Sequence, residues 1–172
     1  MNKLVWRNIG RFMLLMACQL FVLNNVYLGG YVLPMLYVLF IFMLPTGMSR
    51  IPLLLVAFAT GLTIDLMSNV LGLHALACTA CAMMRILFAN RILTRGEPIE
   101  ISTPTISTVT PQYYVTYLLI MYSGFYLVYF ISELFGSRGF GDMLLATLCS
   151  TLCSTLLAVV YQLIFNKRKN EQ

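Results

Sequence analysis

Long apolar stretches occupy most of this chain between Phe12 and Phe165, and the polar breaks between them are mostly a few residues long. A helix needs about 20 mostly apolar residues to cross the roughly 30 Å hydrocarbon layer of a bilayer. The stretches are too long and too weakly alternating for the strands of a membrane β-barrel. The pattern therefore predicts an all-α polytopic bundle of six transmembrane helices, at about 11–28, 31–48, 51–69, 72–92, 113–135 and 142–165.

Basic residues predict the orientation of these spans, because cytoplasmic loops of membrane proteins are enriched in lysine and arginine. One side of the six-span arrangement carries Lys3, Arg7, Arg11, Arg50, Arg91, Arg95, Lys167, Arg168 and Lys169. Only Arg138 falls on the other side. We therefore expect a multi-pass protein with both termini in the cytoplasm, since five spans would place one basic terminus outside.

The composition supports a protein that lies almost entirely in the membrane. Hydrophobic residues make up 60% and charged residues 10% of the 172 residues, which is too little charge for the surface of a soluble domain. We expect one integral membrane domain over residues 1–172. The net charge of +5 follows from the topology, and no basic patch with interleaved aromatic residues predicts nucleic-acid binding.

The one long polar connection covers residues 94–112 and is expected on the cytoplasmic side. Its prolines at positions 98, 104 and 111 argue against a helix. Two interpretations stay open: a solvated linker, or an extended segment that lies against a partner or the lipid headgroups.

Asp65 is the one carboxylate well inside a predicted span. An ionised carboxylate at such a depth costs several kcal/mol unless it is hydrogen-bonded or hydrated. Gly61 lies one turn below it and permits a close helix neighbour, and Ser68 lies beside the same face. His74 opens the next span just after Gly72, so a tight hairpin would bring its ring near Asp65.

Three interpretations of this group stay open. It is a buried hydrogen-bonded knot that fixes the hairpin, a surface or cavity that a protein partner recognises, or a site for a substrate, an ion or a proton. Arg85 is a less suitable partner for Asp65, because the axial gap between them is on the order of 10 Å. We expect its side chain to extend along the helix to the cytoplasmic headgroups.

Two further helix faces are candidates for contacts. Tyr122, Tyr126 and Tyr129 share one face of the fifth span, and they pack within the bundle or face a partner or a cavity. The sixth span carries small residues at four-residue intervals, which let helix backbones approach closely. This helix-packing ridge consists of Ala146, Ser150, Ser154 and Ala158.

No pattern in the chain predicts a catalytic, cofactor-binding or metal-binding residue. There is one histidine, and the sequence contains neither an intramembrane acidic pair nor an H-E-x-x-H motif nor a glycine-rich phosphate loop. The five cysteines all fall within predicted spans, where cysteine usually serves as a small buried apolar residue. An intramembrane enzyme is therefore the weakest of the function classes.

The stretch around Asp65 resembles the rod shape-determining protein MreD family. The matching residues are Gly61, Leu62, Asp65, Ser68, Leu71, Gly72, Leu73, His74 and Ala75. The size of the chain, its proline-flanked inner turn and its short outer connections are also similar to that family. The long connection at 94–112 and the tyrosine-rich fifth span depart from it.

This resemblance implies a non-enzymatic scaffold of the bacterial elongation complex, located in the inner membrane and helping to maintain rod cell shape. It implies MreC as a partner, with MreB, RodA and a penicillin-binding transpeptidase as further members of the peptidoglycan-synthesis complex. It also implies a fold similar to the substrate-binding components of vitamin transporters. A small-molecule-binding transporter component is therefore the alternative function.

Overall fold

The computed structural model describes residues 2–23, 32–45, 47–70, 72–93, 104–105, 110–134 and 139–167, and within these ranges it is all-helical, with six helices and no strand. The helices are α1 (Asn2–Phe21), α2 (Leu39–Phe42), α3 (Arg50–Ser68), α4 (Leu73–Leu93), α5 (Pro111–Leu134) and α6 (Phe140–Lys167). Five of them are long, and α2 is a single turn.

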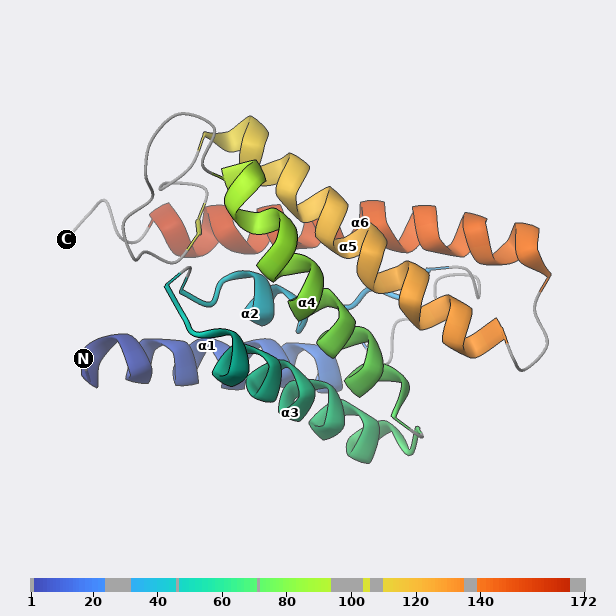
Figure 1. Cartoon of the computed structure of the whole chain (residues 1–172), viewed down its shortest axis with the longest axis horizontal. Coiled ribbons are helices and arrows are strands. Elements are labelled where there is room, and N and C mark those ends of the chain that lie inside the picture. The colour runs from blue at the N-terminus through green and yellow to red at the C-terminus, as the bar shows by residue number, and fades with distance from the viewer. Residues whose placement is uncertain are drawn as a thin grey trace.

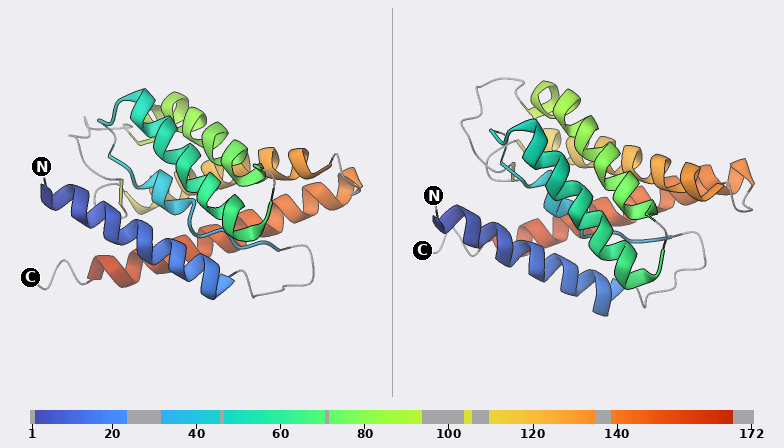
Figure 2. Two further views of the ribbon diagram at one scale, coloured as in Figure 1. Left: turned by 90° about the horizontal axis from the view of Figure 1, so that it is seen from below. Right: turned by 60° about the horizontal axis from the view of Figure 1, so that its bottom comes forward.

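Helices α3 to α6 pack side by side in alternating directions, with α3 against α4, α4 against α5, and α5 against α6. Helix α1 runs in the same direction as α3 (Figures 1 and 2). Two ends of the bundle can therefore be distinguished. The terminal end holds the starts of α1, α3 and α5 and the ends of α4 and α6, at the left of Figure 1. The hairpin end, opposite to it, holds the α3–α4 turn, the end of α5 and the start of α6.

Three helical stretches are long and apolar enough to cross a membrane: Arg50–Ser68, Pro111–Glu133 and Phe140–Phe165. Asn8–Phe21 and Leu73–Leu87 are shorter apolar stretches. Their length and composition indicate a membrane protein.

The two faces of α6 support this conclusion. Leu148, Leu152 and Leu156 are more than 60% exposed on its outer face, whereas Ser150 and Ser154 are completely buried on its inner face. A helix on the surface of a water-soluble protein shows the opposite arrangement, with its apolar side chains inside. Lipid chains around the bundle would cover these leucines, so that their apolar surface would not be exposed to water.

Most of the predicted helix bounds are confirmed. The spans 51–69, 72–92, 113–135 and 142–165 agree with α3 to α6 within two residues at each end. The first helix begins earlier than predicted, at Asn2, and ends at Phe21 instead of 28. Lysine and arginine are good helix formers, so α1 continues through the basic residues that were assigned to its flank. Residues 24–31 lie outside the described part of the chain.

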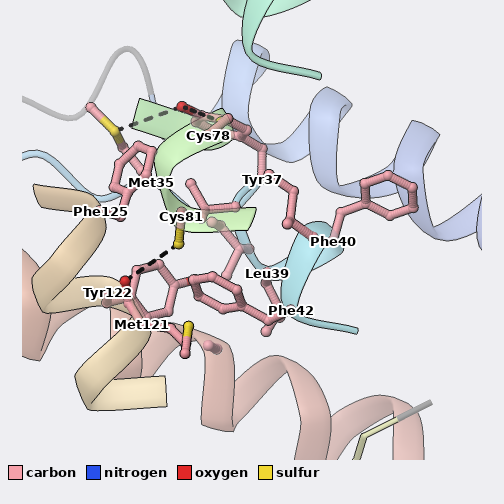
Figure 3. Close-up of a cluster of buried hydrophobic side chains, with 14 of the residues drawn as sticks. Met35, Tyr37, Leu39, Phe40, Phe42, Cys78, Cys81, Met121, Tyr122 and Phe125 are labelled. Carbon is pink, nitrogen blue, oxygen red and sulfur yellow. Dashed lines mark hydrogen bonds between the residues drawn. The ribbon is translucent and has the colours of Figure 1, made fainter. Parts of the chain in front are cut away.

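The prediction of one helix over 31–48 is wrong. We call residues 32–45 the core segment, and only Leu39–Phe42 within it is helical. Pro34 contributes to this break, because it lacks an amide donor and keeps the preceding Leu33 out of the helical region. Every residue from Met35 to Leu44 is at most 9% exposed. The core segment therefore fills the centre of the bundle, with its side chains packed between α1, α4 and α5 (Figure 3).

Backbone groups that leave a helix at membrane depth need partners, because lipid offers none. α6 supplies some of them to the core segment: the Leu33 amide donates to Ser150 Oγ at 3.0 Å, and the Met35 amide lies 3.1 Å from Ser154 Oγ. Tyr126 of α5 joins the same network. Its hydroxyl accepts from the Met35 amide at 3.0 Å and donates to the Leu33 carbonyl at 2.6 Å.

The other neighbours of the core segment complete this pattern. Gln19 of α1 donates to the Pro34 carbonyl at 3.1 Å and accepts from the Leu36 amide at 2.9 Å. Near the terminal end, the Tyr117 hydroxyl lies 3.4 Å from the Phe42 carbonyl. Arg85 of α4 donates to the Leu44 carbonyl. Side chains from four helices thus replace the hydrogen bonds that a continuous helix would have made.

Two tyrosine variants on α5 test this account. We expect Tyr126→Phe to lower the free energy of unfolding by about 1–3 kcal/mol, because it removes the donor to the part-buried Leu33 carbonyl and leaves the buried Met35 amide with Ser154 as its acceptor. Tyr122→Phe is the matched control, since the Tyr122 hydroxyl is buried without a hydrogen-bond partner. Its removal is expected to be neutral or stabilising. Thermal unfolding of both variants in detergent measures the difference, and equal effects would contradict the account.

Candidate functional site

The residues predicted as a site gather at the α3–α4 turn, at the hairpin end of the bundle. α3 ends where Asn69 adopts a left-handed conformation, with φ of 53°. Gly72 has φ of 73°, a conformation that glycine adopts without steric cost. These two residues reverse the chain within a few positions and start α4 beside the end of α3.

The Asp65 carboxylate is 2% exposed and is held by three nitrogens of α4. Its Oδ1 accepts from the His74 amide at 3.0 Å and lies 2.9 Å from His74 Nδ1. Its Oδ2 accepts from the Ala75 amide at 2.8 Å. The first amides of a helix have no acceptor within that helix, and its N-terminus favours a negative charge. Asp65 therefore caps α4 from the neighbouring helix.

Gly61 makes this approach possible. A Cβ atom at this position would lie 2.5 Å from both Ala75 Cα and the His74 carbonyl oxygen. The backbones of α3 and α4 are thus in direct contact one turn below Asp65. Any side chain at this position would push the amides of α4 away from the carboxylate.

The His74 ring is enclosed at the same place, and His74 is 6% exposed. Its centroid lies 5.0 Å from the ring of Tyr129 and 6.1 Å from the ring of Tyr37. With Nδ1–H donating to Asp65, the neutral imidazole keeps Nε2 as an acceptor. These contacts are those expected of a buried hydrogen-bonded knot, the first of the three interpretations of this group. Ser68 lies half-buried at the end of α3.

The tyrosine face of α5 points into the bundle. Tyr122 and Tyr126 are completely buried, and Tyr129 is 8% exposed. The three differ in what they do: Tyr126 binds the core segment, Tyr129 lies against the His74 ring, and Tyr122 packs against the ring of Phe42 at 4.9 Å. They line the interior of the chain's own fold.

The small-residue ridge of α6 is also completely buried at Ala146, Ser150, Ser154 and Ala158. It has a role that the spacing did not predict. The two serines bind the amides of the non-helical Leu33 and Met35, and Ser154 also contacts the Tyr126 hydroxyl of α5. Small side chains at Ser150 and Ser154 let the non-helical backbone of the core segment lie against α6.

One residue that binds the core segment was missed from the sequence, and the position of another was predicted wrongly. Gln19 was not singled out, although an amide side chain in the apolar first span was a signal for a buried partner. Arg85 was expected to reach the headgroups along its helix. Instead it is 4% exposed and donates to the Leu44 carbonyl, because the end of the core segment offers an unpaired carbonyl beside it.

The described residues contain no group of three or more His, Cys, Asp or Glu side chains that could hold a metal ion. Cys78 and Cys81 are completely buried in α4. Comparison of the chain with protein-family models, with curated proteins and with solved structures gave no match.

Two glycine variants test the geometry of the α3–α4 contact. We expect Gly61→Ala to destabilise the protein by about 2–4 kcal/mol, since it forces two packed backbones apart and weakens the cap on α4. Gly10→Ala in α1 is the control, because a Cβ there meets no atom within 4 Å. That variant is expected to be neutral or stabilising by up to about 1 kcal/mol. Similar unfolding temperatures for the two variants would contradict the close approach.

Proposed function

We propose that this chain is a non-enzymatic membrane scaffold of the bacterial elongation complex, which helps maintain rod cell shape by binding MreC and linking it to lateral peptidoglycan synthesis. The proposal rests on the resemblance of the segment from Gly61 to Ala75 to the MreD family. The geometry of that segment gives three of the matching residues a structural role, because Gly61, Asp65 and Gly72 each help to close the hairpin.

The observation that favours a scaffold over a transport component is the filled centre of the bundle. Residues Met35 to Leu44 occupy the space between the long helices and are at most 9% exposed. A solute-binding component needs a central polar space for its ligand. A scaffold needs only a rigid body with outward faces, and a packed interior provides that.

The alternative, a small-molecule-binding transporter component, is favoured by one feature. Non-helical backbone at membrane depth often lines the substrate site of a transporter. In this chain, however, side chains already occupy the amides of Leu33, Met35 and Leu36. Thermal-shift measurements with vitamins and lipid-linked wall precursors separate the two functions, since a strong saturable shift supports the alternative.

The proposed layout has six passes through the inner membrane and both termini in the cytoplasm, with the core segment as the second pass. Its support is that the start of α1 and the end of α6 lie at the same end of the bundle (Figures 1 and 2). We expect reporters fused at residue 1 and at residue 172 to be active on the cytoplasmic side. Reporters on opposite sides of the membrane would rule this layout out.

A photo-crosslinking scan tests the partner. Phe58, Leu76 and Leu148 are each 47–65% exposed and lie on three different helices, α3, α4 and α6. A crosslinking side chain at the face that binds MreC is expected to capture it in living cells, whereas the other faces capture lipid. Depletion of the protein should turn rods into spheres.

The scaffold proposal fails if no outward position captures MreC and depleted cells remain rod-shaped while the variants accumulate at normal levels.

A further inference from the structure

Arg85 carries a charge in the interior of the bundle with few partners. Its side chain is 4% exposed, one Nη atom binds the Leu44 carbonyl, and the guanidinium lies beside the Tyr117 hydroxyl. Its Nε is buried and has no hydrogen-bond partner among the residues that the structure describes. A guanidinium has five N–H donors in a planar fork, and burying this cation without an anion is costly.

No counter-ion for Arg85 exists among the described residues. Their acidic side chains are Asp65, Glu133 and Asp142, and all three lie at the hairpin end of the bundle. Asp65 is already bound by the His74 ring and by two backbone amides of α4. The positive charge of Arg85 is therefore balanced by nothing in the part of the chain that the structure describes.

The position of Arg85 shows where an anion would come from. It meets Leu44 at the end of the core segment and Tyr117 in the second turn of α5. α3 begins close by with the exposed Arg50. Arg85 thus lies toward the terminal end, where helices that span a membrane would approach the lipid phosphates. Guanidinium groups bind phosphate through two parallel N–H bonds.

We propose that Arg85 binds an anionic phosphate group at the terminal end of the bundle. The chemistry is that of a phosphodiester or phosphate monoanion, supplied by the headgroup of an acidic lipid or by free phosphate. This group neutralises the guanidinium and stabilises the contact between α4 and the end of the core segment. The site does not depend on the scaffold role, since any bilayer leaflet supplies phosphates at this depth.

The test uses the full chain in a maltoside detergent, which contains no phosphate. Phosphatidylglycerol, phosphatidylcholine or inorganic phosphate is added, and thermal unfolding and native mass spectrometry follow stability and bound lipid. We expect phosphatidylglycerol to raise the unfolding temperature by about 4 °C or more and to remain bound in the mass spectrum. Arg85→Gln should lose both effects, and Arg50→Gln, an exposed arginine at the same end, should keep them.

Each outcome decides between sources or overturns the site. A response to phosphatidylglycerol alone assigns the phosphate to lipid, and an equal response to inorganic phosphate assigns it to the free ion. If Arg85→Gln does not fold, Arg85→Lys replaces it; the lysine keeps the charge but loses the planar fork, so its response should be clearly smaller. The proposal is overturned if wild type shows no response or if the Arg85 variants respond as wild type does.

Discussion

The fold depends on supplying hydrogen bonds to a stretch of backbone that is not helical in the middle of a membrane-embedded bundle. A continuous helix meets this need by itself, and lipid cannot meet it at all. The core segment meets it through side chains of α1, α4, α5 and α6. Tyr126 and Gln19 each bind two of its backbone groups, and the Tyr126 hydroxyl also contacts Ser154. Each of the four helices therefore forms hydrogen bonds to the same core segment, which holds the helices in place.

This arrangement explains the unusual distribution of polar residues. On α6, Ser150 and Ser154 point inward, where they bind the core segment. Leu148, Leu152 and Leu156 of the same helix are exposed on its outer face. The small-residue ridge of α6 is thus buried inside the bundle. A partner that binds this protein would meet the apolar outer faces, which is consistent with recognition by another transmembrane helix.

The α3–α4 hairpin solves the same problem at one helix end. Its buried carboxylate satisfies two amides at the start of α4 and orients His74, and Gly61 lets the two backbones touch. Asp65 is therefore bound on both of its oxygens by its own fold. Arg85, three turns further along α4, is the opposite case, because its charge has no such compensation within the described chain.

The sequence by itself determined the membrane environment, four of the long helices to within two residues, and the group that closes the α3–α4 hairpin. These features are local: apolar length, turn residues and a glycine one turn from a carboxylate can be recognised over about 15 residues. It left open which of three roles Asp65 has, because the roles differ only in what surrounds the carboxylate.

Tertiary structure alone decided the path of the core segment. Its apolar run and flanking prolines are compatible with a short transmembrane helix, which is what the pattern predicted. Three of the groups that make the broken path stable, Tyr126, Ser150 and Ser154, lie 91 to 119 residues further along the chain. A local pattern cannot report on partners at that separation, since whether an unpaired amide is tolerated depends on which side chain the folded bundle brings to it.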